Sequence, residues 1–301
     1  YMRYFMMKTN FHTHTFRCGH AIGNEEEMVK SAIKNDILEL GFSDHIPLPY
    51  YRLHILKGLP YTLKELRAFL VAIKTIFTNG PAMRMPYCNK KEHLYKVRKV
   101  KEKYKEKIKI YQGFEAEYFE NYLQYYQSLL DSGEVDYLIL GNHFNKYSIH
   151  TRYYGKLNIT NEEIIKYKND LIKAMDSNLF SYIAHPDLFM TGKVYFDEFC
   201  ENITREICLK ALKSDIPLEI NGGGIRRGLR KVGDEKLYPY PNAHFFEIAG
   251  KMGCKVILGI DAHSPEDFNK EIYEDLYKFA KKYHLNIVDK FEFKKGRKET
   301  N

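Results

Sequence analysis

The sequence predicts an α/β fold in which parallel strands bring their carboxyl ends to one rim. Short apolar runs alternate with amphipathic stretches that carry helix start signals, a pattern typical of right-handed crossovers onto a parallel sheet. Seven of the apolar runs also end in a side chain that can bind a metal. If the strands lie side by side, these side chains meet at one rim and predict a polynuclear metal site.

The predicted strand ends are spread along most of the chain. In order, they are residues 10–14, 41–45, 113–117, 141–143, 184–185, 219–221 and 259–263. About sixty residues separate the second run from the third, so we expect two helices there, the second of them basic.

Three helix starts are predicted from capping signals. Residues 62–65 and 160–163 have the Thr-x-x-Glu form of a capping box, in which each side chain accepts a backbone N–H of the first turn. Residues 264–267 place a Ser cap before Pro and two acids that suit the helix dipole. We expect a helix after each signal.

The basic charge of the chain is concentrated in one segment. Residues 84–109 hold eleven Lys or Arg against three Glu, which equals the whole net charge of +8. We interpret about 79–107 as a basic helical insertion, in which Leu94, Val97 and Val100 share a packing face with Tyr104 and Ile108. A solvated helix face is the preferred interpretation of the charge, and attraction of an anionic substrate or nucleic acid is the alternative.

Composition favours one soluble catalytic domain over residues 1–301. The hydrophobic content of 44% can build a substantial core, and no apolar run approaches the ~20 residues of a membrane helix. The first residues do not resemble a signal peptide, and Met2, Met6 or Met7 is the expected start. Five cysteines without a Cys-x-x-Cys pair fit neither a disulfide framework nor a zinc ribbon, which favours a reducing cytoplasm.

Two strand ends each offer a pair of ligands to one side. Residues two apart on a strand point the same way, so His12 pairs with His14 and Asp261 with His263. One such pair alone could be two ordinary histidines, but in a closed barrel the last strand lies beside the first and the four side chains become neighbours. The other candidate ligands are His20, His45, Glu115, His143 and His185.

The donor set indicates which metals fit. Imidazoles mixed with a few carboxylates suit zinc, iron or manganese better than magnesium or calcium, which prefer oxygen throughout. We expect two or three divalent ions. The remaining histidines do not follow predicted strands and are interpreted as surface or packing residues: His54, His93, His150, His244 and His284.

Ordered motifs recur at the strand ends. They are His-Thr-His at 12–14, Phe-Arg-Cys-Gly-His at 16–20, Gly-Phe-Ser-Asp-His at 41–45 followed by Ile-Pro-Leu-Pro, Gly-Phe-Glu at 113–115, Gly-Asn-His at 141–143, Ala-His-Pro-Asp at 184–187, Glu-Ile-Asn at 219–221 and Gly-Ile-Asp-Ala-His at 259–263. From about Met7 to Phe268 the chain resembles the polymerase-and-histidinol-phosphatase (PHP) superfamily, and within it the histidinol-phosphate phosphatases. The resemblance implies a distorted seven-stranded (β/α)7 TIM-like barrel.

The resemblance also implies a ligand set for each ion. One ion would be held by His12, His14, Glu115 and Asp261. Glu115 would bridge to a second ion held by His143 and His185, and a third would be held by His20, His45 and His263. Glu117 faces the rim but matches no ligand position, so we expect it behind the ligands or in a salt bridge.

The expected charge of the site favours phosphate chemistry. Several divalent cations against two ligand carboxylates leave the pocket positive, which attracts a phosphate dianion. The glycine-rich loop 221–228 adds Arg226 and Arg227, whose planar forks match phosphate oxygens; we favour Arg226 as the contact and place Arg227 second. A basic residue expected soon after His185 is absent until Lys193, so a second phosphate clamp is missing or supplied by Lys193.

The catalytic residues we expect are Glu115, His45 and Asp261. A proton for the leaving alcohol could come from His45 or Asp44, and the sequence leaves that choice open.

Three functions compete at this stage. The leading hypothesis is a metal-dependent phosphomonoesterase that hydrolyses L-histidinol phosphate to L-histidinol and phosphate in histidine biosynthesis. The second keeps the site but changes the substrate to another small phosphate ester, a nucleotide or phosphotyrosine. The third is a nucleic-acid-binding or nuclease accessory module that uses the basic helix. The expected partner is a small phosphorylated substrate, with no nucleic acid or membrane; the oligomeric state is left open.

Overall fold

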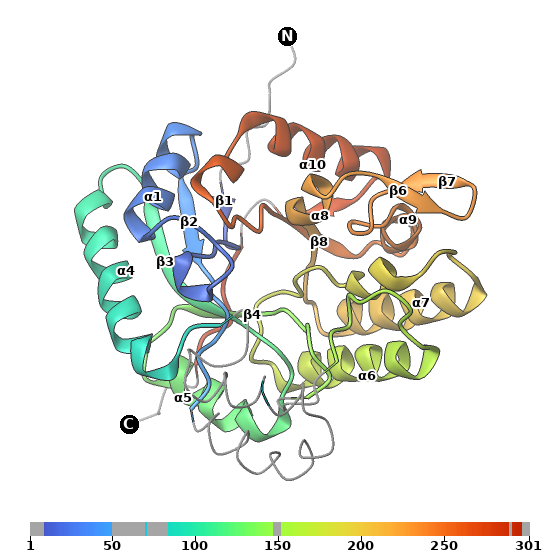
Figure 1. The fold of residues 1–301 in the computed structure, drawn as a ribbon, viewed down its shortest axis with the longest axis horizontal. Helices are drawn as coiled ribbons and strands as arrows, with labels where there is room; N and C mark the ends of the chain where they lie inside the picture. Colours follow the sequence, from blue (N-terminus) through green and yellow to red (C-terminus); the bar gives the residue numbers. More distant parts are fainter. Residues whose placement is uncertain (1–8, 50–69, 71–83, 147–151, 289–290, 297–301) are drawn as a thin grey trace.

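A curled parallel sheet lies at the centre of the fold, and helices surround it (Figure 1). The computed structural model describes residues 9–49, 70, 84–146, 152–288 and 291–296. One sheet has the order β1 (Thr9–Asn10), β2 (Glu39–Phe42), β3 (Lys109–Ala116) and β4 (Tyr137–Leu140), and each neighbouring pair is parallel. A second parallel sheet joins β5 (Leu218–Asn221), β8 (Lys255–Gly259) and β9 (Asn286–Ile287). The predicted α/β fold with a parallel sheet is confirmed.

Isolated bridges connect the two sheets on both sides. Ile183, in the fifth predicted run, pairs in parallel with Leu140 and with Leu218. On the other side Thr13 pairs with Ala262, which places the first and last motifs side by side as expected. The closed seven-stranded count stays a prediction, because the fifth run joins only through single bridges and β9 adds a strand that was not predicted.

The helices turn apolar sides inward. In α6 (Asn161–Ser177), Ile164, Tyr167 and Leu171 are buried and recur at spacings of three or four. The other described α-helices are α1 (Glu25–Lys34), α4 (Lys90–Tyr104), α5 (Leu123–Asp131), α7 (Glu198–Lys213), α8 (Gly222–Arg226), α9 (Ala243–Lys251) and α10 (Lys270–Lys282). The 3-10 helices are η1 (Phe16–Cys18), η2 (Tyr87–Asn89), η3 (Glu120–Tyr122), η4 (Leu188–Gly192) and η5 (Pro265–Asp267), and β6 (Arg230–Val232) pairs with β7 (Glu235–Leu237) in a hairpin. None of the helices in the described ranges has the length and apolar character that crossing a bilayer requires.

Two of the three predicted helix starts can be compared with the structure. The capping box of Thr160 and Glu163 opens α6 as predicted. Ser264 also forms a capping box, but it opens only the three-residue η5, which ends where the backbone of Phe268 leaves the helical region (φ −78°, ψ 89°). The α-helix α10 starts later, after its own cap at Asn269. The signal at 62–65 lies outside the described residues.

The basic helix predicted from the charge pattern is α4. Leu94, Val97 and Val100 are buried as expected, and the helix ends at Tyr104. It leads into β3 and packs against it and against α1, which is where a crossover helix of the β2–β3 connection lies. Lys101 and Lys103 form ion pairs with exposed or half-buried acids, as expected for a solvated face. The boundaries of the proposed basic insertion stay a prediction.

The two faces of the sheet pack into different cores. Along β4, Leu138 and Leu140 belong to the large core shared with the helices, whereas Tyr137 and Ile139 belong to a small separate cluster. The Tyr137 hydroxyl donates to the carbonyl oxygens of Phe11 (2.8 Å) and Phe42 (3.0 Å). This small cluster lies behind the strand ends and fixes their positions.

Candidate metal centre

Glu115 lies at the middle of the candidate site and turns its two oxygens to different histidines. Its Oε2 is 3.5 Å from His12 Nε2, 3.4 Å from His14 Nε2 and 3.2 Å from His45 Nδ1. Its Oε1 is 3.1 Å from His185 Nε2 and 3.6 Å from His143 Nε2. One carboxylate at the end of β3 therefore faces two groups of imidazoles.

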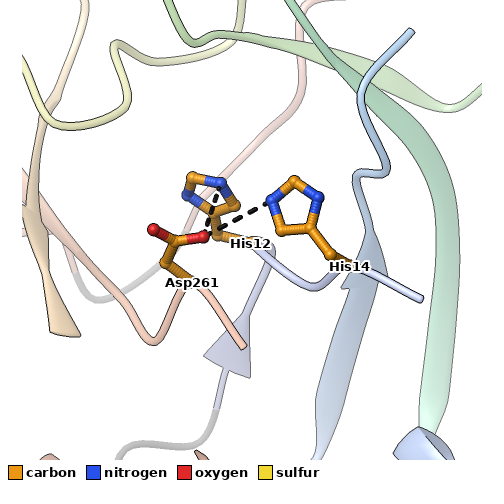
Figure 2. Close-up of side chains that lie close together, drawn as sticks. All are labelled: His12, His14 and Asp261. Carbon is orange, nitrogen blue, oxygen red and sulfur yellow. Dashed lines mark ion pairs between the residues drawn. The ribbon is translucent and has the colours of Figure 1, made fainter. Parts of the chain in front are cut away.

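Asp261 completes the first group. Its Oδ1 lies 3.3 Å from His12 Nε2 and 3.4 Å from His14 Nε2, and Figure 2 shows the three side chains pointing toward one another. Asp261 has a φ of 54° and His185 a φ of 30°, values that side-chain-bearing residues rarely adopt. Backbone strain of this kind occurs at functional sites, where the surrounding structure holds it.

The donor atoms fit a divalent metal ion. The ligand atoms of His12, His14 and Asp261 lie within 4.8 Å of one another, and so do those of His12, Glu115 and His185. The buried Nε2 atoms of His12 and His14 have no hydrogen-bond partner. An unpaired polar atom is costly in a protein interior, and a cation between these imidazoles and carboxylates would satisfy it.

Burial sets the charge states of several imidazoles. It lowers the pKa of His14 to about 4 and the pKa of His143 to about 3, and holds the pKa of His45 well below its usual value. These rings are therefore neutral near pH 7, the form in which imidazole binds metals. In His12 and His185 burial acts in the same direction, but neighbouring carboxylates outweigh it and raise the pKa.

The two central carboxylates are ionised. Burial alone would raise the pKa of Glu115, but His143, His45 and His12 hold it well below its usual value. The pKa of Asp261 is likewise well below its usual value, because His12 and His263 outweigh the effect of burial. Negative oxygens therefore face both the neutral rings and the more basic rings of His12 and His185.

Among the described residues, neither the predicted second set (Glu115, His143 and His185) nor the predicted third set forms one group whose three ligand atoms lie within 4.8 Å of one another. His20 Nε2 and His263 Nε2 are 2.9 Å apart, and the rings of His20 and His45 have centroids 5.3 Å apart. His45 instead groups with His14 and Glu115, or with Glu117 and His143. In the described ranges, no group of three ligand atoms includes His20 or His263. Binding of a third ion by His20, His45 and His263 stays a prediction.

A cleft of about 380 Å³ opens above these groups. Its outer wall includes Tyr153, Leu188 and Tyr240, and both predicted arginines line it. Lys193, the other predicted phosphate contact, is not among the lining residues and pairs with Asp197 at 3.1 Å.

The two arginines have different surroundings. Arg226 donates to the carbonyl oxygens of Ile260 (2.8 Å) and Asp261 (2.6 Å), and its Nε lies 3.1 Å from the carboxylate of Asp267. Arg227 lies over the ring of Tyr240, 5.2 Å from its centroid, and forms no ion pair with a carboxylate within the described part of the chain. The donors of Arg226 are therefore engaged within the protein, and the choice between the two arginines as phosphate contact stays a prediction.

The two candidate proton donors, Asp44 and His45, have different surroundings. Asp44 is fully buried, does not line the cleft, and accepts hydrogen bonds from the backbone and hydroxyl of Thr15 and from the thiol of Cys18. Cys18 Sγ in turn lies 3.3 Å from His14 Nδ1. Asp44 therefore contacts Cys18, which in turn contacts the candidate ligand His14, whereas His45 lines the cleft.

Glu117 and His93 are buried partners of other charged groups. The Glu117 carboxylate forms an ion pair with Arg84 at 2.6 Å, as expected for a residue in a salt bridge, and lies 3.9 Å from His143 Nδ1. The ring of His93, expected to be a surface or packing residue, packs inside the protein with Nδ1 3.1 Å from Glu25.

Sequence reasoning missed the part that Glu219 plays. Its Oε1 lies 2.8 Å from His12 Nδ1, and its Oε2 accepts hydrogen bonds from the His185 backbone amide (3.1 Å) and Asn221 Nδ2 (2.7 Å). The sequence feature that could have indicated this role is an acidic residue within a short apolar strand, because a buried charged side chain needs a partner.

The comparisons with known proteins agree with this geometry. The PHP domain family matches residues 10–222. A Deinococcus radiodurans protein named "Probable histidinol-phosphatase" is 22% identical over 268 residues, covering 84% of this chain and 85% of its own. Among solved structures, histidinol phosphate phosphatase from Lactococcus lactis, complexed with zinc, L-histidinol and phosphate, is similar with a TM-score of 0.65 and 19% identity, over 97% of this chain and 99% of that one.

A further solved structure has the same fold. The HisK protein of Listeria monocytogenes matches with a TM-score of 0.61 and 19% identity, over 87% of this chain and 98% of its own. The family match spans more than two thirds of the chain and includes most of the residues gathered around Glu115. The chain therefore belongs to the PHP domain family.

Proposed function

We propose that the chain is a metal-dependent phosphomonoesterase that hydrolyses L-histidinol phosphate to L-histidinol and phosphate. The observation that carries the proposal is the Glu115 carboxylate, whose two oxygens face separate groups of histidines at the floor of a cleft. The Lactococcus protein of similar fold, which was solved with zinc, histidinol and phosphate, supports the choice of substrate.

The residues that would hold metal follow from the geometry around Glu115. His12, His14, Glu115 and Asp261 would hold one ion, while Glu115, His143 and His185 would hold a second. Their nitrogen and oxygen donors suit zinc, iron or manganese, and a third ion near His20 and His263 belongs to the proposal. Bound divalent ions would polarise a phosphate ester and lower the pKa of water, which is the chemistry that this hydrolysis needs.

The protein's own side chains would bind and orient the substrate. We propose Arg227 as the phosphate contact, because its fork lies in the cleft without a carboxylate partner among the described residues. Tyr153 and Tyr240 offer flat apolar surfaces for the organic part of the ester. His45 lines the cleft, where its neutral ring would relay a proton from water to the leaving alcohol rather than supply one of its own.

A second candidate keeps the reaction and changes the ester. The outer wall of the cleft contains Tyr153, Leu188 and Tyr240, and aromatic walls also suit other small phosphate esters that carry a flat ring. The substrate test therefore includes phosphotyrosine and a nucleoside monophosphate.

The test combines metal content with phosphate release. The purified protein should contain zinc, iron or manganese by elemental analysis and release phosphate from histidinol phosphate with a higher kcat/KM than from the other esters. A metal-free protein that stays inactive after zinc, iron or manganese is added would overturn the proposal. A preference for another ester would replace only the substrate.

His12→Ala tests whether turnover depends on a metal held by this ligand group. Removing a ligand from the group with His14 and Asp261 should lower metal content and turnover together, by at least about 100-fold in turnover. Full activity with unchanged metal content in this variant would refute the ligand assignment.

A further inference from the structure

We propose that Glu219 is a positioning residue, which holds His12 in the tautomer that leaves Nε2 free for a metal. The inference rests on the proposed metal-dependent function and adds a role for a side chain that neither lines the cleft nor belongs to a metal group. Glu219 is fully buried in β5, so solvent screens its carboxylate little and its contacts with neighbouring groups are strong.

The two nitrogens of His12 meet different surroundings. Nδ1 lies 2.8 Å from Glu219 Oε1. An ionised carboxylate can only accept a hydrogen bond, so the neutral ring must carry its proton on Nδ1. Nε2 then has a lone pair, and it lies 3.3 Å from Asp261 Oδ1 and 3.5 Å from Glu115 Oε2. The tautomer that satisfies Glu219 is therefore the one that can bind a metal between these groups.

The second oxygen of Glu219 fixes the carboxylate in place. Oε2 accepts from the backbone amide of His185 and from Asn221 Nδ2, so two donors hold that side of the group. His185 is itself a candidate ligand with a φ of 30°, and this contact ties its backbone to His12 through one side chain. The fold also leaves room for the carboxylate, since a Cβ on Gly259 would clash with Oε1.

His14 has a different partner behind it. Its Nδ1 faces the thiol sulfur of Cys18, which donates to Asp44. A thiol is a weaker acceptor than a carboxylate. The two histidines of the His-x-His motif are therefore oriented by chemically different groups, and the stronger restraint acts on His12.

Glu219→Gln changes hydrogen bonding with little change in shape. The amide has one accepting oxygen and one donating NH2 group, and the side toward His185 and Asn221 needs an acceptor for two donors. With its oxygen on that side, the amide points NH2 at His12 Nδ1, which must then accept. His12 would carry its proton on Nε2, the tautomer that cannot bind metal there.

The experiment measures the tautomer and the metal affinity separately. In metal-free protein with ¹⁵N-labelled histidine, spectra are recorded over a pH series that extends above the raised pKa of His12; once the ring is neutral, the wild type should show an Nδ1–H tautomer signal that is absent in His12→Ala. In Glu219→Gln that signal should change to the Nε2–H form. Zinc affinity, measured by competition with a chelator, should fall roughly 10- to 100-fold in Glu219→Gln.

Two further variants make the outcome specific. Glu219→Asp keeps an acceptor on every side and should retain the Nδ1–H signal and more zinc affinity than Glu219→Gln. Asp170→Asn is the matched control, because Asp170 is a buried carboxylate bonded to Tyr154 and Lys166 away from the site, and it should leave zinc affinity unchanged.

Every other outcome counts either against the positioning role of Glu219 or against the proposed metal-dependent function. An unchanged tautomer signal, or zinc affinity in Glu219→Gln within about twofold of the wild type, would overturn the positioning role. Loss of folded protein in both Glu219 variants but not in Asp170→Asn would make Glu219 a stability residue and also overturn it. Wild-type protein that binds no metal would instead refute the proposed function, while the tautomer of His12 could still be measured without metal.

Discussion

Arg226 and Arg227 are neighbours in the chain, yet their guanidinium groups have different partners. We predict that Arg227→Gln raises KM for the phosphate ester about 10- to 100-fold with a smaller change in kcat, because a charge-assisted hydrogen bond contributes about 1.5–3 kcal/mol. Arg226→Gln is the matched control. Its donors bind the carbonyl oxygens of Ile260 and Asp261, so this change should mainly lower stability. A larger rise of KM in Arg226→Gln than in Arg227→Gln would contradict the assignment.

The candidate ligands could be predicted residue by residue because each follows an apolar run. His12, Glu115, His185 and Asp261 all meet near one point, although the first and last are almost a whole chain apart. Glu219 belongs to the sixth strand-end motif but received no role, because the sequence does not show that its carboxylate meets Nδ1 of His12, 207 residues away. Asp44 is the converse case: its place beside His45 in the sequence suggested a role in proton transfer, whereas the structure shows it accepting a hydrogen bond from the Cys18 thiol.

At the scale of elements, the glycines of the Gly-Phe motifs make room for one tyrosine. A Cβ on Gly113 would lie 2.5 Å from the ring of Tyr137, and a Cβ on Gly41 would clash with its hydroxyl. The ring lies between backbones and cannot shift freely, because its hydroxyl bonds the carbonyl oxygens of Phe11 and Phe42. We predict that Gly113→Ala lowers the free energy of unfolding by about 3 kcal/mol through overpacking, measured by urea denaturation.

A double-mutant cycle tests whether Tyr137 is the cause. In a Tyr137→Leu background, Gly113→Ala should cost much less, because the smaller side chain leaves space for the new methyl group. Strict additivity of the two changes would mean that the cost of Gly113→Ala has another origin.

The start of α1 carries a buried ion cluster with a pH-dependent contribution. Burial alone would raise the pKa of Glu25, but hydrogen bonds from His93, the backbone and Arg17 lower it to about 2. The pKa is depressed in the folded state, so the carboxylate stabilises the fold above its ordinary pKa of 4.5 and loses this effect as pH falls toward 2. Glu25→Gln should lower the free energy of unfolding by about 2 kcal/mol at pH 7.

The pH profile is the decisive measurement for Glu25. The difference between wild type and Glu25→Gln should shrink between pH 4.5 and pH 3, as followed by urea denaturation. Glu92→Gln serves as the control, because Glu92 also pairs with Arg17 but is 57% exposed, and its loss should cost less stability than the loss of Glu25. A difference that is constant with pH would exclude the ionised carboxylate as the source.

Elements whose formation depends on neighbouring residues were predicted from the sequence. Elements that depend on contacts with residues far along the chain were missed. The capping box at Thr160 and the buried face of α4 need only neighbouring residues, and both were confirmed. The strand β9 was not predicted, because two residues paired with β8 carry little pattern of their own. The run before His185 was predicted as a strand, yet Ile183 forms only single bridges on each side.

At the scale of the molecule, the site exists only when distant strand ends meet. The Thr13–Ala262 bridge brings together the two ends of the family pattern, and Glu115 lies between them and the group with His143 and His185. The sequence predicts this closure because parallel strands with crossovers converge at their carboxyl ends. The exact strand number could not be predicted, since it depends on hydrogen bonds at single positions such as Ile183.

Metal removal should therefore weaken the whole fold as well as the activity. An ion bound only by the folded protein stabilises it by about 4 kcal/mol when its free concentration is about 1,000 times Kd, so a chelator should lower Tm by roughly 5–10 °C. Restoring zinc should restore Tm in the wild type, but it should have little effect in His12→Ala, which lacks a donor shared by two of the metal groups. The same Tm with and without chelator, in protein whose metal was shown to be removed, would mean that the strand ends meet without help from an ion. In that case, the unpaired Nε2 atoms of His12 and His14 would need another partner.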